Sequence, residues 1–403
     1  MPEGDYDVAM PPKESALPTV KVSPRGVNRL KSGHLWVYKS DVTAADGTPP
    51  GSVVRVADPR GKALGTALYS SSSQIAIRMI STEPAIDFSA LLRRRISDAI
   101  TYRGKFVHDT NAYRVIFSEA DGIPGLIVDR YNEILSLQIL TQAMDSILAR
   151  ETVLSELVDK LLPASVFERA DARVRELEAL PTRDSVLLHG EKTATTFAMN
   201  SVQFHYDALE GQKTGAFLDQ RENYAAATQY ARGQALDVFC YQGGFALHLA
   251  NVCDQVTGVD SSRPALEVAD RNAALNKREI EWIEANAFDL LKDYSASGQL
   301  YDTIVLDPPA FAKTKRDLDS AMRGYKELNL RALKMLPPGG ILVTCSCSFH
   351  VTASSFLEML SSAALDSHRN LRLLEVRGQS KDHPTLLNMP ETGYLKCVIA
   401  VVS

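Results

Sequence analysis

The stretch LDVFCYQGGF at residues 236–245 decides the fold of the C-terminal half of the chain. Its first residues have the apolar character of a buried strand, and its two glycines form a turn that can open a helix. Continuous apolar strands that alternate with helices are typical of a parallel sheet covered on both faces, so residues 201–403 are predicted to form an α/β domain. The expected strands are 235–239, 255–259, 303–306 and 340–344, and the expected helices are 244–251, 263–276 and 317–336.

The region before this domain has a different texture. Residues 19–82 contain short β-type runs separated by Gly and Pro, which indicates a small barrel or sandwich. Residues 83–200 mix helical and strand patterns and are predicted to form an α+β domain, whereas residues 1–18 are predicted to be a flexible tail. The expected strands are 19–22, 36–38, 52–56, 65–69, 74–80, 113–117, 126–128 and 134–140, and the expected helices are 88–103 and 146–162.

The composition excludes several classes of protein. Of the 403 residues, 45% are hydrophobic and 23% are charged, which is typical of a globular chain. No apolar run approaches the roughly 18 residues that a membrane span needs, and the first residues lack the pattern of a secretory signal. The 5 cysteines all lie at or after position 240, which does not suggest a disulfide framework. We therefore expect a cytoplasmic protein without a membrane partner.

The charge is unevenly distributed along the chain. The formal net charge of −5 by itself argues against a nucleic-acid partner. Residues 19–80, however, carry nine basic and three acidic side chains, whereas the preceding tail and the remainder of the chain are acidic. A basic module on an acidic body is compatible with local binding of RNA.

Three acidic residues lie at the ends of predicted strands. Asp237 precedes the Gly turn, Asp260 ends the next strand, and Asp307 begins an Asp-Pro-Pro sequence. Ligands of open α/β sheets bind at the carboxyl ends of the strands, and a carboxylate there can accept hydrogen bonds from both ribose hydroxyls. Asp237 and Asp260 could each instead cap a helix or stabilise a turn. The run GGFALH lacks the third glycine of a dinucleotide fingerprint, and the three elements together resemble class I S-adenosylmethionine-dependent methyltransferases.

Two cysteines mark the end of the last predicted strand, in the sequence GGILVTCSCS at residues 339–348. Cytosine C5 is a weak nucleophile, and attack of a thiolate at C6 makes C5 reactive toward a methyl donor. The triplet Thr-Cys-Ser is similar to the nucleophile motif of pyrimidine C5 RNA methyltransferases, which favours Cys345 and leaves Cys347 as the alternative. A cysteine in a strand could instead be a small buried apolar residue. The two cysteines and His350 lack a fourth ligand, so we expect no metal site.

Further stretches resemble one family over nearly the whole chain, the RlmI-type methyltransferases, which form 5-methylcytosine in large-subunit ribosomal RNA. The resemblance implies an N-terminal PUA-like RNA-binding domain, a middle α+β domain and a C-terminal class I Rossmann-like methyltransferase domain. It implies S-adenosylmethionine as the cofactor and large-subunit ribosomal RNA as the partner, and it leaves room for a homodimer. The matching stretches are GHLWVY at 33–38, SEADGIPGLIVD at 118–129, QKTGAFLDQR at 212–221, DHP at 382–384 and YLK at 394–396.

The resemblance assigns roles to residues of the α/β domain. Asp219 and Arg221 would belong to the cofactor pocket, Asp260 would hold the ribose, and Asp307 with Pro308 would line the target base. Arg221 could instead form a structural pair with a carboxylate. The expected cofactor contacts are Asp219, Arg221, Asp237, Phe239, Tyr241, Gly243, Asp260, Ser261, Asn286, Asp307 and Pro308, and the expected catalytic residues are Cys345 and Asp307.

The chain departs from related enzymes at two positions. Ala310 stands where cytosine methyltransferases with two cysteines carry one of them, so the group that assists proton removal from C5 is open between Asp307 and a water molecule. Asn286 stands where the family commonly has an aspartate against the adenine amino group. The amide oxygen of Asn can still accept a hydrogen bond, so we expect cofactor binding to persist at lower affinity.

Cationic and aromatic residues lie together in the basic N-terminal module. Arg25, Arg29 and Lys31 precede Trp36, and this mixture suits unpaired RNA through phosphate contact and stacking. Trp36 could instead belong to the core, because an alternating strand buries every second residue. The resemblance adds Lys313 as a phosphate contact, although it could also be a solvated loop lysine.

Two other functions stay open at this point. Asp-Pro-Pro followed by Phe311 resembles the loop of methyltransferases that act on base nitrogens, so an RNA guanine N-methyltransferase is one alternative, and its chemistry needs no thiolate. The second alternative is a non-catalytic RNA-binding assembly factor with a vestigial cofactor pocket. The presence of Asp260, Asp307 and Cys345 together argues against that second alternative.

Overall fold

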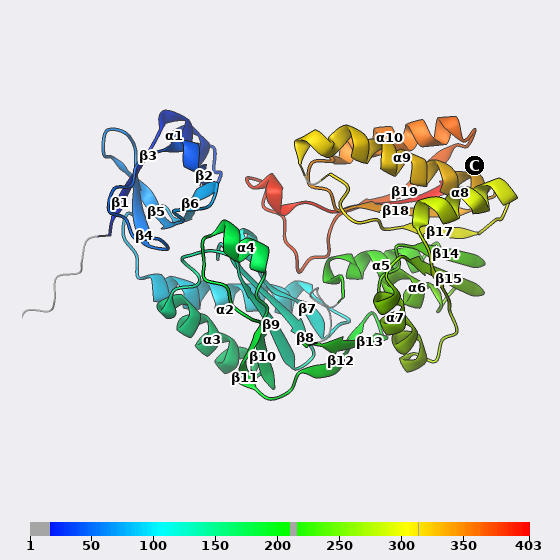
Figure 1. The fold of residues 1–403 in the computed structure, drawn as a ribbon, viewed down its shortest axis with the longest axis horizontal. Coiled ribbons are helices and arrows are strands. Elements are labelled where there is room, and N and C mark those ends of the chain that lie inside the picture. The colour runs from blue at the N-terminus through cyan, green and yellow to red at the C-terminus, as the bar shows by residue number, and fades with distance from the viewer. Residues whose placement is uncertain (1–16, 210–215, 313) are drawn as a thin grey trace, which may run out of the picture.

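The computed structural model describes residues 17–209, 216–312 and 314–403. The described strands form four sheets, with six, five, two and seven strands in chain order. Figure 1 shows the six-stranded sheet at one end of the molecule, the seven-stranded sheet at the other and the five-stranded sheet between them. In the described ranges, no helix combines the length and the apolar character that crossing a membrane requires.

The N-terminal module is a sheet in the order β2-β6-β5-β4-β1-β3 with one helix packed beside it. Its core is formed by β-branched side chains such as Val20, Val54 and Ile77, all fully buried, because each strand turns alternate residues to one face. The predicted strands agree with the structure within two residues. The elements are β1 (Thr19–Val22), α1 (Pro24–Lys31), β2 (Trp36–Tyr38), β3 (Val42–Ala44), β4 (Val53–Ala57), β5 (Ala63–Tyr69) and β6 (Ile75–Ser81).

Helix α1 is absent from the sequence prediction. Its residues are mostly polar and only Gly26 and Val27 are buried, so its apolar period is too short to indicate a helix. The cap is the signal that could have found it. Ser23 precedes Pro24, and the Ser23 hydroxyl accepts a hydrogen bond from the Gly26 backbone N–H at 3.2 Å.

The middle part combines a five-stranded sheet, in the order β11-β10-β9-β8-β7, with two long helices. Ile96 of α2 and Val153 of α3 share one buried apolar core with Val128 and Leu137 of the sheet, as the predicted α+β organisation requires. The elements are α2 (Phe88–Phe106), β7 (Ala112–Phe117), η2 (Ser118–Asp121), β8 (Leu126–Tyr131), β9 (Ile134–Ile139), α3 (Ile147–Leu161), β10 (Ser165–Glu168), α4 (Ala172–Leu177) and β11 (Val186–Gly190).

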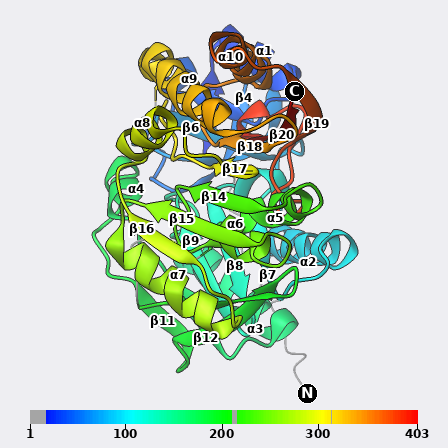
Figure 2. The same cartoon turned by 90° about the vertical axis from the view of Figure 1, so that its right-hand side faces the viewer.

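The C-terminal domain is a seven-stranded sheet in the order β16-β15-β14-β17-β18-β20-β19. The strands from β16 to β18 run parallel, and β20 and β19 add an antiparallel edge. Figure 2 shows α8, α9 and α10 on one face and α5, α6 and α7 on the other, so the predicted α/β layering is confirmed. The strands are β14 (Gln234–Val238), β15 (Gln255–Asp260), β16 (Glu281–Glu284), β17 (Thr303–Leu306), β18 (Ile341–Ser346), β19 (Leu371–Arg377) and β20 (Lys396–Val402). The helices are η3 (Leu218–Gln220), α5 (Arg221–Thr228), α6 (Gly244–Leu249), α7 (Arg263–Leu275), α8 (Ala287–Ser297), α9 (Leu318–Met335) and α10 (Ala353–Asp366).

A separate antiparallel hairpin, β12 (Ala194–Met199) with β13 (Val202–Asp207), joins the middle part to the C-terminal domain. The His205 backbone N–H donates to the Asn272 side chain of α7 at 2.8 Å. The predicted domain limit between residues 200 and 201 falls in the turn of this hairpin. A limit at that turn would divide two strands that pair along their whole length.

The segment between β19 and β20 extends from the seven-stranded sheet toward the N-terminal module (Figure 1). Its Glu391 carboxylate lies 3.2 Å from His34 Nε2. Two residues further along the chain, at the start of β2, the Trp36 indole N–H donates to Glu119 of η2 at 2.9 Å. The GHLWVY stretch at 33–38 therefore joins the N-terminal module to both of the other parts of the molecule.

Candidate active site

The chain turns sharply where β14 ends. Phe239 and Tyr241 have φ angles of 68° and 50°, and Gly243 has a φ of 85°. A left-handed backbone costs a non-glycine residue on the order of 1–3 kcal/mol, and such residues cluster at functional sites. The neighbouring strand supports the turn, because the backbone N–H groups of Phe239 and Cys240 both donate to the carbonyl oxygen of Val259. The sheet thus holds a strained segment of backbone at its carboxyl edge.

Two acidic side chains hold this turn. Asp260 accepts hydrogen bonds from the backbone N–H groups of Tyr241 and Ser262, each at 2.9 Å. Asp237 accepts from the Ala246 N–H at 2.8 Å, while its Oδ1 is buried and finds no partner among the described residues. Loss of hydration raises the pKa of Asp237 to about 8. Both acidic side chains therefore stabilise the turn, and each keeps hydrogen-bonding capacity for a ligand, Asp260 as a carboxylate and Asp237 mainly as a protonated carboxyl at neutral pH.

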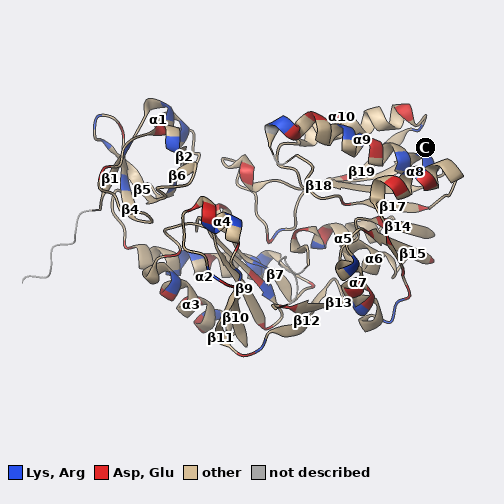
Figure 3. Cartoon of the chain, in the orientation of Figure 1, with Lys and Arg blue, Asp and Glu red and all other residues tan. Residues whose placement is uncertain are grey.

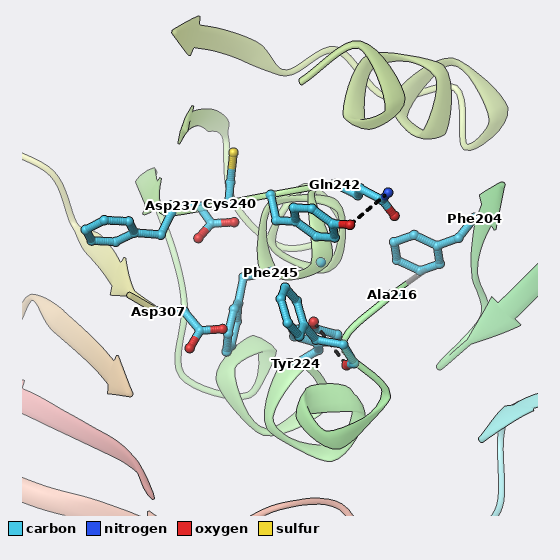
Figure 4. Close-up of a pocket in the computed structure, with 12 residues that line it drawn as sticks. Phe204, Ala216, Tyr224, Asp237, Cys240, Gln242, Phe245 and Asp307 are labelled. Atoms are coloured by element: carbon cyan, nitrogen blue, oxygen red, sulfur yellow. Dashed lines mark hydrogen bonds between the residues drawn. The ribbon is translucent and has the colours of Figure 1, made fainter. Parts of the chain in front are cut away.

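A pocket lies beside the turn, and Figure 4 shows the side chains around it. Its volume is about 340 Å³ with the space open to solvent included. Aromatic rings form much of the wall, and two carboxylates interrupt it. The lining residues are Phe204, Ala216, Phe217, Tyr224, Asp237, Phe239, Cys240, Tyr241, Gln242, Gly244, Phe245 and Asp307.

The donor and acceptor groups of this pocket fit S-adenosylmethionine. The unpartnered Asp237 oxygen and the Asp260 carboxylate offer acceptors for amino and hydroxyl groups. The rings of Phe239 and Tyr241 offer apolar surface for the adenine and the methionine chain. The carboxylate of Asp307 suits the positive charge of a sulfonium group.

The predicted cofactor residues do not all reach the pocket wall. Four of them line the wall: Asp237, Phe239, Tyr241 and Asp307. Gly243 and Asp260 belong to the adjoining turn. Pro308 is buried directly after Asp307, and Ser261 is exposed. Asn286 caps α8, and its side-chain oxygen accepts from the Phe288 N–H at 2.9 Å. That oxygen is the atom expected to accept from adenine, so the helix cap competes with the predicted contact.

Asp219 and Arg221 are not among the residues that line the pocket. Asp219 accepts a hydrogen bond from the Tyr394 hydroxyl at 2.6 Å. Arg221 is only 1% exposed and donates to Asp382 at 3.0 Å. Burial alone would raise the pKa of Asp382, but His383 and Arg221 hold that pKa well below its usual range. Arg221 thus forms the structural pair that the sequence left open, and it is not part of the pocket wall.

Asp307 follows β17 and has an unusual environment for a carboxyl group. Its Oδ1 accepts a hydrogen bond from the Gln220 side-chain amide at 2.9 Å. Loss of hydration and the nearby Asp219 carboxylate raise the pKa of Asp307 to about 7, against the effect of that hydrogen bond. A carboxyl group with this pKa can both donate and accept a proton near neutral pH.

The two cysteines at the end of β18 differ in their accessibility. Cys345 is fully buried opposite Cys397 of β20, and loss of hydration raises the pKa of its thiol well above the ordinary value. Cys347 lies just after the strand and is half-buried, with its Sγ 3.9 Å from the Pro308 carbonyl oxygen. Cys347 is therefore the more accessible thiol, whereas the buried thiol of Cys345 also neighbours the Asp307 carboxyl group. The preference for Cys345 stays a prediction, and Cys347 is the alternative that accessibility favours. Within the described part of the chain, no group of three His, Cys, Asp or Glu side chains could hold a metal ion.

The predicted cationic RNA contacts lie on or beside α1. Figure 3 shows Lys and Arg on this helix. Arg25 pairs with Asp41 at 2.8 Å, although 67% of its side chain is exposed. The Arg29 guanidinium lies over the Tyr38 ring, 4.4 Å from its centre, and Lys31 is exposed. The group therefore presents positive charge at the surface, with Arg25 and Arg29 held in place by intramolecular contacts.

Two other predicted RNA contacts have different positions. Trp36 is half-buried, and its indole N–H is used by the hydrogen bond to Glu119, so this ring belongs mainly to the joint between domains. Lys313 and part of the QKTGAFLDQR stretch, residues 212–215, lie outside the described residues.

Several residues of the pocket are missed by the sequence motifs. Phe204 comes from the hairpin and Tyr224 from α5, and neither lies next to a strand end of the seven-stranded sheet. The glycine pair holds a signal for Tyr224. A Cβ built on Gly244 would lie 2.4 Å from the Tyr224 hydroxyl oxygen, so the close approach of this ring depends on a glycine.

Known protein families and relatives match the sequence of this chain over most of its length. A PUA-like domain family matches residues 20–82, and an S-adenosylmethionine-dependent methyltransferase family matches residues 148–384. The ribosomal RNA large subunit methyltransferase I of Shewanella amazonensis is 37% identical over 395 residues, which cover 95% of this chain and 99% of that protein. The protein of the same name from Photobacterium profundum is 36% identical over 383 residues, with 91% of this chain and 95% of that protein covered.

Solved structures show the same architecture. SMU.776, assigned as a methyltransferase and crystallised with S-adenosylhomocysteine, has a TM-score of 0.81 at 19% identity and covers 95% of this chain and 99% of its own. A Streptococcus mutans protein assigned as an S-adenosylmethionine-dependent methyltransferase has a TM-score of 0.80 at 18% identity over the same shares. The expected PUA-like and Rossmann-like domains are thereby confirmed. With a methyltransferase family match over more than half of its length and full-length relatives above 35% identity, the chain belongs to the ribosomal RNA large subunit methyltransferase I family of S-adenosylmethionine-dependent methyltransferases.

Proposed function

We propose that this protein methylates C5 of a cytosine in large-subunit ribosomal RNA, with Cys347 as the covalent nucleophile. The position of Cys347 carries the proposal, because a half-buried thiol lies 3.9 Å from the carbonyl oxygen of Pro308, beside the Asp307 carboxyl group. Methyl transfer to a base nitrogen needs no thiol. The class of RNA is carried over from the names of relatives that match the chain at 36–37% identity over nearly its whole length.

The reaction divides into an addition, a methyl transfer and an elimination. The Cys347 thiolate adds to C6 of the cytosine, and the electron pair of the C5–C6 double bond becomes available at C5. Bound S-adenosylmethionine supplies an electrophilic methyl group for C5. Removal of the C5 proton then restores the double bond, while the C6–S bond breaks and releases the thiolate.

Asp307 suits the proton transfers on either side of the methylation step. Its pKa of about 7 allows the protonated carboxyl to donate to a ring nitrogen while the thiolate adds. The carboxylate that results can accept the C5 proton in the elimination, directly or through a water molecule. Since Ala310 offers no second thiol in this loop, Asp307 is the candidate base that the described chain provides.

The position of Phe311 weakens the alternative of a guanine N-methyltransferase. Its ring centre lies 4.8 Å from that of Tyr325 and 6.0 Å from that of Phe288. The ring is therefore engaged with side chains of α9 and α8. An aromatic residue in these contacts is not free to stack on a target base.

The N-terminal module supplies the RNA contacts in this proposal. Residues 19–82 would bind RNA through the positive surface of α1, with Arg25, Arg29 and Lys31 facing phosphate groups. Because this surface is small and the remainder of the chain is acidic, affinity should be modest and should fall with added salt.

The nucleoside product tests the proposal directly. Undermethylated large-subunit ribosomal RNA is incubated with S-adenosylmethionine and the enzyme, and its digested nucleosides are separated by mass spectrometry. The wild type and Cys345→Ala should form 5-methylcytidine, and Cys347→Ala should form none. A methylated guanosine as the product, or full activity of Cys347→Ala, would contradict the proposal.

A further inference from the structure

Lys396 is a buried cation whose role the mechanism above does not explain. It opens β20 and is 8% exposed. Its Nζ donates to the carbonyl oxygens of Ser348 at 2.6 Å and of Tyr394 at 2.7 Å. Because Ser348 directly follows Cys347 in the chain, the ammonium group lies against the loop that carries the thiol.

This cation lacks the partner that buried lysines usually have. In the described residues, both hydrogen bonds of the Lys396 ammonium go to neutral carbonyl oxygens, and no carboxylate lies within ion-pair distance of it. Buried charges are normally paired, because an uncompensated charge away from water is costly. An ammonium group has three donors, so one N–H of Lys396 is left for a further acceptor.

We propose that Lys396 is the positioning residue that stabilises the thiolate of Cys347, so that β20 supplies the positive charge that the nucleophile needs. This inference rests on the proposed function, in which Cys347 reacts as a thiolate. The step that it assists is the transfer of the thiol proton to solvent water before sulfur adds to the base. Lys396 forms no covalent bond and touches neither the base nor the methyl donor.

The charges around the thiol show why a cation is needed. Loss of hydration and the carboxylates of Asp307 and Asp219 raise the pKa of Cys347 to about 12, whereas a backbone hydrogen bond and the positive charge of Lys396 act against them. Tyr394 also faces this thiol and is neutral, with its hydroxyl donating to Asp219. Loss of hydration lowers the pKa of Lys396 to about 8, so the group still carries its charge at neutral pH.

A purely structural role would use the same two hydrogen bonds to hold the loop after β18 against the start of β20. The two roles differ in one measurable property, which is the reactivity of the Cys347 thiol. A structural role affects thermal stability without a specific effect on the thiol pKa. An electrostatic role changes the thiolate fraction at a given pH, and it is preserved by arginine.

The test measures alkylation of Cys347 by iodoacetamide in the full-length protein, without RNA or cofactor. Peptide mass spectrometry follows the rate between about pH 6.5 and 9.5, with the half-buried Cys253 as an internal reference. In Lys396→Met the alkylation of Cys347 should be about tenfold slower, which corresponds to one pKa unit. In Lys396→Arg it should stay within about twofold of the wild type. The exposed Lys334→Met is the matched control and should leave the rate unchanged.

Equal alkylation rates of Cys347 in the wild type and a folded Lys396→Met variant would overturn the inference. If Lys396→Met does not fold, Lys396→Gln takes its place, since a neutral amide keeps a donor without the charge and should slow the alkylation as well. The nucleoside product separates this test from the proposed function. Formation of 5-methylcytidine with unchanged alkylation rejects the role of Lys396 alone, whereas slow alkylation with methylation at another position rejects the proposed function alone.

Discussion

The two halves of the site are built in different ways. At the cofactor edge, the loops after β14 and β15 position a ligand mainly with backbone, as the left-handed Phe239 and Tyr241 show. At the base edge, the carboxyl ends of β17 and β18 lie beside the start of β20, and the half-buried Asp307 and the buried Lys396 are proposed to do the positioning. Asp307 and Lys396 there come from strands that are about ninety residues apart in the sequence.

This difference separates binding from chemistry. The cofactor edge is a local structure in which Asp260 fixes the turn through two backbone N–H groups. The base edge depends on a balance of charges, because Asp219 and Asp307 oppose the ionisation of Cys347 and Lys396 favours it. Substitutions at the cofactor edge should therefore affect cofactor affinity, and substitutions at the base edge should affect rate, pH dependence or stability.

Removal of Cys347, the proposed nucleophile, should have the largest effect. Cys347→Ala should lower the methylation rate by on the order of 10⁴-fold or more, since loss of a covalent nucleophile abolishes its pathway. Affinity for S-adenosylmethionine, measured by calorimetry, should stay the same because the cofactor edge is untouched. The buried Cys345→Ala serves as the matched control, and a variant at Cys345 that loses all activity while folded would break the comparison.

Removal of the buried charge of Asp382 should have the second largest effect, and this effect should be on stability. Asp382→Asn leaves the Arg221 guanidinium buried without its 3.0 Å partner, so the free energy of unfolding should fall by about 3 kcal/mol or more. Because the pKa of Asp382 is lowered in the folded protein, its contribution is present at neutral pH and is lost as the pH falls below about 4.

Urea denaturation at several pH values measures this effect. The difference in the free energy of unfolding between the wild type and Asp382→Asn should have its full size at pH 7 and should become smaller in acid. The exposed Asp270→Asn provides the control and should change little at any pH. Equal stability of Asp382→Asn and the wild type at pH 7 would show that the buried pair does not support the base edge.

Neutralisation of Asp307 should change activity and stability in opposite directions. Asp307→Asn cannot transfer a proton, so methylation should fall by about 10²-fold. The folded protein raises the pKa of Asp307 to about 7, so the wild type loses stability from this group as the pH rises from about 4 to 7. Thermal unfolding should therefore show the variant to be the more stable protein at pH 8 and equal to the wild type in acid. A less stable variant at pH 8 would contradict the charge balance described for this edge.

Substitution of Asp260, the predicted ribose acceptor, should have the smallest of these effects. Asp260→Asn keeps the size of the side chain but loses the charged acceptor, so affinity for S-adenosylmethionine should fall about tenfold. Alkylation of Cys347 in the apo protein should stay unchanged. Ser261→Ala tests the neighbouring predicted contact. Because Ser261 is exposed and does not line the pocket wall, this change should lower the affinity for S-adenosylmethionine much less than Asp260→Asn does. A change in thiol reactivity in Asp260→Asn would show that the two edges are coupled.

The contrast between the edges also explains what the sequence could predict. Four strands were predictable because each is a continuous apolar run, namely β14, β15, β17 and β18. The turn after β14 was predictable because its residues are contiguous in the sequence. The difference in accessibility between Cys345 and Cys347 was not predictable, because it depends on how far β18 pairs with β20, which lies some fifty residues further along the chain. The stretch YLK at 394–396 contains Lys396, but no short motif connects this residue with the thiol.

Other parts were hidden for physical reasons of a different kind. Helix α1 has too few buried residues to show a helical period of apolar side chains, and its Ser-Pro cap is the sequence feature that indicates it. The aromatic Phe204 reaches the pocket from a hairpin whose strands carry no motif. Arg221 lies next to cofactor residues in the sequence, yet its partner Asp382 turns it into a structural residue.

Trapping of the covalent intermediate tests the central claim most directly. Large-subunit RNA that contains 5-fluorocytidine is incubated with the enzyme and S-adenosylmethionine, because fluorine at C5 cannot leave as a proton and the adduct cannot resolve. The account predicts a covalent protein–RNA adduct that maps to the peptide of Cys347, persists in Cys345→Ala and is absent from Cys347→Ala. An adduct at Cys345, or active enzyme that methylates normal RNA but forms no adduct, would contradict it.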